Sequence, residues 1–320
     1  MFVTLMSSAI AVGITFLYGC VGEILTEKSG HLNLGIPGIM SAGAAGGCVG
    51  VSLYMGALSS PDNANYFVLL LVAIITSAFF AAMLGAIYSF LTVTLRCNQN
   101  VTGLAITTFG VGLSTFLMEG KVDKTHFAAA GRILTRSLPF ADNLGWFGEI
   151  FLSHGILVYL AIALALIAAF YLRKTKSGLY LCSIGENPAT ADAAGINVSG
   201  YKYGAVLAGS AIAGLGGLYY IMDYLRGSWE YGIEAMGWLA IALVIFTLWK
   251  PDLSILGAIL FGALYIASSY ITGVSFSEKK LLKLLPYVVT IVVLIITSVL
   301  DSKENQPPAA LGLAYFREER

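Results

Sequence analysis

The residues that could do chemistry are few in this sequence and lie far apart. His31, His126 and His154 are too widely separated to suggest a metal site, and the four cysteines show no metal or redox spacing. Glu23 and Glu234 fall at the ends of apolar segments, and we interpret both as solvated interfacial carboxylates. We therefore expect no catalytic residue, no metal site and no cofactor.

Missing patterns restrict the function further. The phosphate-binding pattern GxxxxGK[ST] does not occur, so the chain should not hydrolyse ATP itself. No pair of charged residues falls in the middle of an apolar segment, which argues against an ion-coupled secondary transporter. The formal net charge is zero, so nothing indicates a nucleic-acid partner. The absence of a nucleophile or metal cluster argues against a membrane-embedded enzyme.

A polar interruption, NLGIPG over 33–38, stands at the start of one apolar segment. Pro37 removes a backbone donor and clashes with the preceding turn, which predicts a broken helix. Broken membrane helices are buried in protein or line a polar cavity, and they often mark transport sites. The alternative is a plain loop-to-helix entry with Asn33 as the cap. The two hypotheses are compatible if the helix begins part-way into the bilayer.

A second pattern, IGENPATADAAGINVSG over 184–200, predicts a short helix with marked ends. Asn187-Pro188 indicates a turn, and proline fits the first turn of a helix. The alanine-rich run favours a helix, and Gly195 should end it with a positive φ. A compact helix held between two membrane spans suits docking into a groove on a soluble partner.

The elements that carry these patterns are built for a bilayer. Apolar residues make up 58% of the chain and charged residues 11%, whereas soluble domains have about 45–50% and about 25%. Because about 20 apolar residues span the hydrocarbon core, we expect an all-α polytopic bundle of about nine spans (8–10) with one broken helix. The expected spans are 2–22, 34–58, 66–95, 100–118, 153–172, 201–222, 235–249, 253–272 and 284–300.

We expect residues 1–300 to form one transmembrane domain and 301–320 to be a loose, polar, cytoplasmic tail. The long polar connections 119–152 and 173–200 flank the fifth span, so they should lie on opposite sides of the membrane. The basic residues are divided almost evenly but lean toward a cytoplasmic 173–200. Two stripes of small residues predict central, closely packed helices. They are Gly38, Ala42, Gly46 and Gly50, and Ala205, Gly209, Ala213 and Gly217.

Several motifs, taken together, resemble one known family. They are GEILTEKSGHLNLGIPGIMSAGA (22–44), NQNVTGLAITTFGVGLSTFL (98–117), RKTKSGLYLCSIGENPATADAAGINV (173–198), AGSAIAGLGG (208–217) and GWLAIALVIFTLWKP (237–251). The chain resembles the permease subunits of bacterial ABC importers for simple sugars, nucleosides and branched-chain amino acids. It is most similar to the shorter permease of nucleoside importers that use a basic-membrane-lipoprotein-type binding protein.

The resemblance implies a permease in the bacterial inner membrane that moves a small polar solute, most simply a nucleoside. Simple sugars or riboflavin remain alternative solutes, and an ion-coupled secondary transporter remains the alternative mechanism. The implied partners are the lipid bilayer, an ABC ATPase, a second homologous permease and an extracytoplasmic solute-binding lipoprotein.

The resemblance also implies roles for individual residues. The segment 184–200 would be the coupling helix that contacts the ATPase, through Gly185, Glu186, Asn187, Pro188, Ala194, Gly195 and Ile196. We expect the translocation path to be lined by Asn33, Gly35, Pro37, Gly38, Thr107, Thr108 and Trp238. The chain departs from the family pattern at Pro37, where glutamate is usual, and also at Cys182 and Met236.

Overall fold

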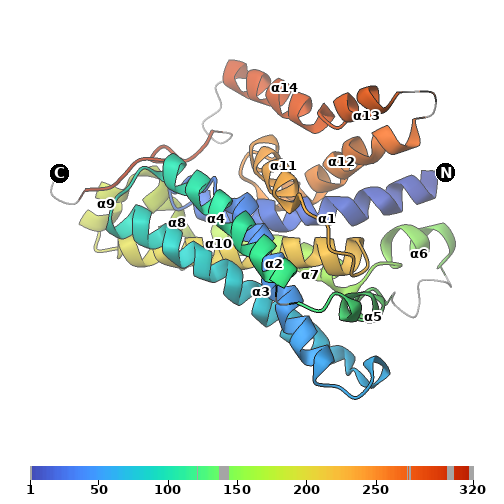
Figure 1. Cartoon of the computed structure of the whole chain (residues 1–320). Coiled ribbons are helices and arrows are strands. Elements are labelled where there is room, and N and C mark those ends of the chain that lie inside the picture. Colours follow the sequence, from blue (N-terminus) through green and yellow to red (C-terminus); the bar gives the residue numbers. More distant parts are fainter. Residues whose placement is uncertain are drawn as a thin grey trace.

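The computed structural model describes residues 2–120, 122–136, 144–271, 273, 275–300 and 306–316. Within these residues the regular elements are helices and there is no β-strand, so the predicted all-α class is confirmed. Figure 1 shows long helices running side by side in one bundle.

The main helices follow the apolar runs of the sequence. Their bounds are α1 Phe2–Glu27, α2 Ile36–Gly56, α3 Tyr66–Ser89, α4 Gln99–Gly120, α5 Thr125–Leu134, α6 Gly145–Phe151, α7 Ile156–Lys174, α8 Lys176–Glu186, α9 Pro188–Ala193, α10 Val198–Tyr219, α11 Ile233–Phe246, α12 Pro251–Tyr270, α13 Phe276–Leu282 and α14 Leu285–Leu300. Single turns of π-helix, η2 Phe90–Thr94 and η4 Tyr220–Tyr224, extend α3 and α10. A short 3-10 turn, η1 Pro61–Asn63, precedes α3.

Seven helices of the described chain are long and apolar enough to cross a membrane. They correspond to the predicted spans one to six and eight. The seventh predicted span is the 14-residue helix α11, and the ninth is the 16-residue helix α14. Both are shorter than the roughly 20 residues that a straight crossing needs. The predicted polytopic bundle is thus confirmed.

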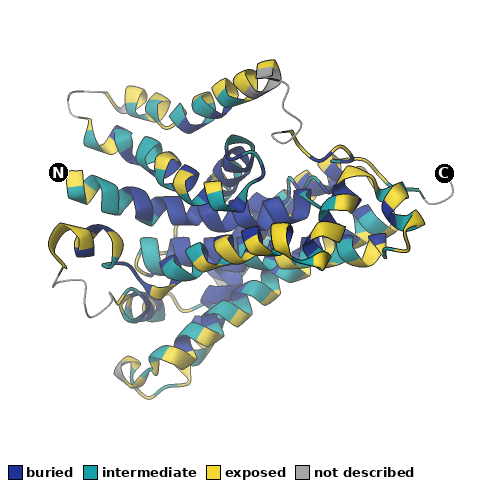
Figure 2. Cartoon of the chain, turned by 180° about the vertical axis from the view of Figure 1, so that it is seen from behind, coloured by how far each residue is buried: buried dark blue, intermediate teal, exposed yellow. Residues whose placement is uncertain are grey.

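Helices α1, α2 and α10 form the centre of the bundle. α2 and α10 are the most completely buried of the long helices, and Figure 2 shows buried residues gathered along the bundle centre. A Cβ added to Gly43 of α2 would lie only 2.4 Å from the Cα of Gly214 in α10. The two backbones therefore approach as only glycine allows. The prediction that the small-residue helices are central is confirmed.

The two long polar connections lie at opposite ends of the bundle, as predicted. α8 and α9 lie at one end, together with the C-terminal residues, while α5 and α6 lie at the other (Figure 1). At the α9 end, Arg173 forms a bidentate ion pair with Asp252, with N–O distances of 2.9 and 2.7 Å. We call the end that carries α8 and α9 the α9 end, and the end that carries α5 and α6 the α5 end.

The predicted broken helix needs correction. α2 runs without interruption, and Pro37 stands in its first turn, where the missing N–H would have no helical partner anyway. The N-cap is Gly35 rather than Asn33. The helical irregularities are instead the two π-helical turns, η2 and η4. Such turns are difficult to predict because they depend on packing rather than on a breaking residue.

Candidate functional site

The segment around α9 has the local structure that its sequence predicts. The Asn187 side chain accepts a hydrogen bond from the backbone N–H of Thr190 at 3.0 Å, and Pro188 occupies the first turn. At the other end Gly195 has φ +82°, and the Ile196 N–H donates to the Ala191 carbonyl at 3.1 Å. This pattern is a Schellman end, which requires a residue that tolerates positive φ. The predicted conformation of Gly195 is confirmed.

Most of the predicted coupling residues share one exposed surface. Glu186, Asn187, Ala194 and Gly195 are exposed, and Pro188 and Ile196 are half-buried. We call these six residues the α9 surface. The seventh predicted residue, Gly185, is buried, and a Cβ there would lie 2.4 Å from the Lys28 carbonyl oxygen. Gly185 therefore positions the segment against the loop after α1 and does not belong to its exposed face.

The α9 surface rests on a small hydrophobic cluster of its own. Ile184, Ala191 and Val198 are buried together, with Ile196 and Tyr315 packed against them. Ile184 comes from α8, Ala191 from α9 and Val198 from α10, so the cluster joins three consecutive helices. The α9 surface is consequently attached to the central helix α10.

The expected loose tail is wrong for residues 306–316, which pack on the α9 end. Ala310 donates to the Gly185 carbonyl at 2.9 Å, and Gly312 donates to the Gly30 carbonyl at 3.1 Å. The Tyr315 hydroxyl donates to a carboxylate oxygen of Asp192 at 2.9 Å. The tail thus ties the coupling segment to the loop between α1 and α2.

That loop, residues 28–35, is organised by side chains that surround its backbone. The Tyr88 hydroxyl donates to the Leu32 carbonyl at 2.7 Å, and the Thr107 hydroxyl donates to the Leu34 carbonyl at 2.7 Å. The Asn33 side-chain oxygen accepts from the Gly35 N–H at 2.9 Å. Satisfying these backbone groups lets the loop be buried. Its polar residues fix where α2 begins.

Glu23 is not the solvated interfacial group that we expected. Its side chain is fully buried, and it accepts a hydrogen bond from the Asn33 backbone N–H at 2.8 Å. Glu27, one turn later, is also buried and accepts a hydrogen bond from the Trp249 indole N–H. Both carboxylates therefore connect α1 to neighbouring segments.

Four of the seven predicted path residues form a packing junction where α2 begins. Asn33, Gly35, Pro37 and Gly38 are buried, and a Cβ on Gly38 would lie 2.5 Å from the Ile106 carbonyl oxygen of α4. Gly237 of α11 also lies against Pro37, where an added Cβ would be 2.4 Å from the proline Cα. α2 therefore starts between α4 and α11.

The remaining predicted path residues are more accessible. Thr107 and Trp238 are half-buried, and Thr108 is exposed. The Thr108 hydroxyl donates to the Leu104 carbonyl of its own helix at 3.1 Å. Thr108 and Trp238 are thus at least partly accessible, whereas the buried residues position α2.

A cleft that our sequence reasoning missed lies nearer the α5 end. It encloses about 160 Å³ and is lined by Ser41, Val111, Ser114, Thr115, Trp229, Glu230, Tyr231, Gly232, Ile233 and Glu234. Ser41 follows Pro37 by about one turn of α2, and Val111 follows Thr107 by one turn of α4. The cleft therefore begins where the packing junction ends.

The chemistry of this cleft is aromatic and acidic. The rings of Trp229 and Tyr231 meet edge to face, with centroids 6.1 Å apart. Among the described residues the Trp229 indole N–H is buried and has no hydrogen-bond partner. Glu230 and Glu234 add carboxylates. The signal in the sequence was the cluster WEYGIE over 229–234, directly before a short apolar segment.

Comparison with known proteins places the chain in a family. Residues 5–296 match the family model described as branched-chain amino acid transport system / permease component. The chain is 30% identical to TsgC13 of Haloferax volcanii, described as a glucose ABC transporter permease, over 98% of both chains. It is 30% identical to the nucleoside ABC transporter permease NupC of Lactococcus lactis, over 87% of both chains. It is 29% identical to the guanosine ABC transporter permease NupQ of Bacillus subtilis, over 94% of this chain and 92% of that one.

These matches cover nearly the whole chain, including the loop before α2, the α9 segment and the newly found cleft. They confirm the resemblance drawn from the sequence motifs, and they agree with a polytopic helical bundle. The chain therefore belongs to the branched-chain amino acid transport system permease family, as a multi-pass membrane subunit of an ABC transporter.

Proposed function

We propose that this chain moves nucleosides inward across the bacterial cytoplasmic membrane and that ATP hydrolysis by a separate ATPase drives the movement. A second homologous permease and an extracytoplasmic solute-binding lipoprotein would complete the importer. The α9 end faces the cytoplasm in this proposal, and the α5 end receives the binding protein.

The observation that carries the proposal is the α9 surface. It is an exposed, well-capped helix that is anchored on α10 through its own hydrophobic cluster. A helix fixed in this way can pass a movement of a soluble partner to the central helices of the bundle, because packed elements move together. The sequence lacks the GxxxxGK[ST] pattern, so the ATP-hydrolysing site would belong to the partner.

The cleft between α2, α4 and the 229–234 segment supports a nucleoside as the solute. An aromatic pair offers a flat apolar surface for a base, and carboxylates accept hydrogen bonds from sugar hydroxyls. The buried Trp229 indole N–H adds a donor that lacks a partner among the described residues. Two of the relatives are described as nucleoside and guanosine permeases.

A simple sugar is the second candidate, because the relative TsgC13 is described as a glucose permease and matches this chain along its full length. Sugars also pack against aromatic rings and donate hydroxyls to carboxylates. What separates the two solutes is the base, which only a nucleoside presents to Trp229 and Tyr231.

We also propose that Thr108 and Trp238 lie on the translocation path and that Asn33, Gly35, Pro37 and Gly38 hold the start of α2 beside it. The exposure of Thr108 and the half-buried position of Trp238 support this division. Thr107 belongs with the positioning group, since its hydroxyl is bonded to the Leu34 carbonyl.

The test is solute-stimulated ATP hydrolysis by the assembled importer in nanodiscs, with adenosine, uridine, glucose and riboflavin offered through the binding protein. We expect the nucleosides to stimulate hydrolysis. Stimulation by glucose or riboflavin alone would reject the nucleoside assignment and retain the permease.

A pair of variants tests whether the solute binds in the cleft. Trp229→Ala should raise the KM for nucleoside uptake, because it removes the larger aromatic surface of the cleft. Phe116→Ala is the matched control, since Phe116 is an exposed aromatic residue on α4 outside the cleft. An unchanged KM in both variants would remove the cleft from the path.

A further inference from the structure

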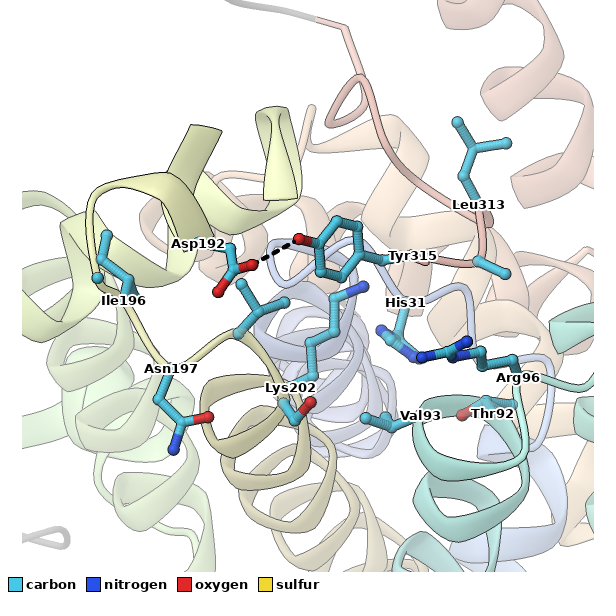
Figure 3. A pocket seen from close by; sticks show the side chains of 14 residues that line it. His31, Thr92, Val93, Arg96, Asp192, Ile196, Asn197, Lys202, Leu313 and Tyr315 are labelled. Carbon is cyan, nitrogen blue, oxygen red and sulfur yellow. Dashed lines mark hydrogen bonds between the residues drawn. The ribbon is translucent and has the colours of Figure 1, made fainter. Parts of the chain in front are cut away.

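A second polar cavity lies at the α9 end, enclosed by parts of the chain that are distant in sequence. It has a volume of about 400 Å³, and Figure 3 shows the side chains that line it. Its walls come from the loop before α2, the π-helical turn after α3, the segment between α9 and α10, and the tail. Nothing in the proposed transport cycle uses this cavity.

Lys202 of α10 extends into the cavity, which Tyr315 and His31 also line (Figure 3). Its side chain is only 3% exposed. Within the described part of the chain it makes no hydrogen bond or ion pair. Removing a positive charge from water is costly unless an opposite charge compensates it, so a compensating anion is expected from outside the described residues.

His31 lines the same cavity and is also without a polar partner. Its side chain is 1% exposed, and neither ring nitrogen has a hydrogen-bond partner among the described residues. Burial, with a smaller contribution from the charge of Lys202, lowers the pKa of His31 to about 3. The imidazole is therefore neutral near pH 7, and its ring N–H is available to donate to a ligand oxygen.

A second cation and a helix start complete the lining. The backbone turns sharply after the π-helical turn, where Arg96 has φ +58°, and its guanidinium lies 4.8 Å from the centre of the Phe316 ring. The first turn of α10 contributes Val198 and Ser199, and free N–H groups at a helix start favour anions. The acidic residue in the lining is Asp192, whose carboxylate accepts the Tyr315 hydroxyl.

We propose that this cavity binds a phosphate group, held by Lys202 and Arg96 as cations, by His31 as a neutral donor and by the first turn of α10. A phosphate offers several charged oxygens at once, which matches a set of convergent donors better than a single carboxylate does. The group could belong to a small phosphorylated molecule or to a phospholipid headgroup.

A ligand in this cavity would act on the α9 surface. The residues Asp192, Gly195 and Ile196 form one wall, and Leu313 and Tyr315 of the tail form another. A phosphate bound between them would fix the tail and the α9 segment against α10. Binding at this site would then make the conformation of the segment that we propose as the ATPase contact depend on the concentration of a phosphorylated ligand.

The experiment measures binding to the isolated full-length chain, so it does not depend on transport. The wild-type protein is placed in phosphatidylcholine nanodiscs, and its melting temperature and equilibrium binding are measured with inorganic phosphate and with AMP. A parallel set replaces part of the lipid with phosphatidylglycerol. Lys202→Gln removes the buried cation, and Lys176→Gln removes an exposed charge at the same end as the matched control.

We expect phosphate or AMP to bind, with Lys202→Gln weakening that binding at least about tenfold and Lys176→Gln leaving it unchanged. A Lys202-dependent rise in melting temperature with phosphatidylglycerol alone would support the site with a lipid as the ligand. Lys202→Gln removes an unpaired buried charge, so its melting temperature without ligand should not fall. The absence of any Lys202-dependent effect of phosphate, AMP or phosphatidylglycerol would overturn the proposal, and would leave the cation to be compensated by a partner protein.

Discussion

Substitutions at and beside Gly195 can distinguish an effect on the folding of the α9 segment from an effect on its docking. Its φ of +82° means that a side chain there costs about 1–2 kcal/mol in backbone strain. No atom lies within 4 Å of an added Cβ, so there is no steric clash inside the chain. A large side chain at this position would project from the α9 surface toward whatever binds it.

Three variants divide these effects. Gly195→Ala adds the strain with little bulk, and Ala194→Leu adds bulk at a neighbouring exposed position whose φ is −79° and carries no strain. Gly195→Leu adds both. Strain alone would shift the local equilibrium of the helix end by about 5- to 30-fold. Overfilling a packed interface costs about 1–3 kcal/mol, which corresponds to an affinity about 5- to 150-fold weaker.

The assay is co-purification of the ATPase with each variant, together with solute-stimulated ATP hydrolysis and the amount of variant in the membrane. If α9 docks on the ATPase, Ala194→Leu and Gly195→Leu should both lose hydrolysis, Gly195→Ala should lose less, and all should reach the membrane. If Gly195→Ala resembled Gly195→Leu while Ala194→Leu behaved as wild type, strain would explain the loss. Normal ATPase recovery in all three would refute the assignment of α9 as the coupling helix.

Two further predictions concern the packing that holds α2. Thr107→Val keeps the side-chain shape but removes the hydrogen bond to the Leu34 carbonyl, so it should cost about 1 kcal/mol in thermal unfolding of the detergent-solubilised protein. Thr108→Val, at an exposed position on the same helix, should change stability by less than about 0.5 kcal/mol, and an equal loss in both would contradict the role given to Thr107. Gly43→Leu should greatly reduce the yield of monodisperse protein in size-exclusion chromatography, because its Cβ would meet the α10 backbone. Gly112→Leu, where nothing lies within 4 Å of the Cβ, should not, and equal yields would show that α2 and α10 can separate without loss of the fold.

Much of the fold could be predicted because local patterns determine it. Long apolar runs specify helices regardless of their neighbours, and the small-residue stripes indicated which helices are central. The Schellman end at Gly195 was predictable because its signal lies within one helical turn. These features need no knowledge of the tertiary structure.

Two of the incorrect predictions concern groups whose partners lie in other segments of the chain. Glu23 was interpreted as solvated because its partner, the Asn33 backbone N–H, becomes adjacent only after the chain has turned. The tail was interpreted as loose because its polar composition does not reveal backbone bonds to Gly185 and Gly30. Pro37 was interpreted as a break because its position relative to the helix start was unknown.

The site was predicted only in part for the same reason. The α9 surface is continuous in sequence and was found, whereas the aromatic cleft needs residues from α2, α4 and the segment before α11. The aromatic and acidic cluster at 229–234 was the available clue. The cavity around Lys202 likewise combines four separate segments, and a single lysine near the start of a helix gave no signal.

The most direct test of ATP-driven nucleoside import is solute uptake into proteoliposomes that contain this chain with its ATPase and second permease, with the binding protein outside. We predict uptake of radiolabelled adenosine that requires hydrolysable ATP on the α9 side and continues when a protonophore collapses the proton gradient. The same uptake by this chain alone, driven by an ion gradient and independent of ATP, would contradict this prediction.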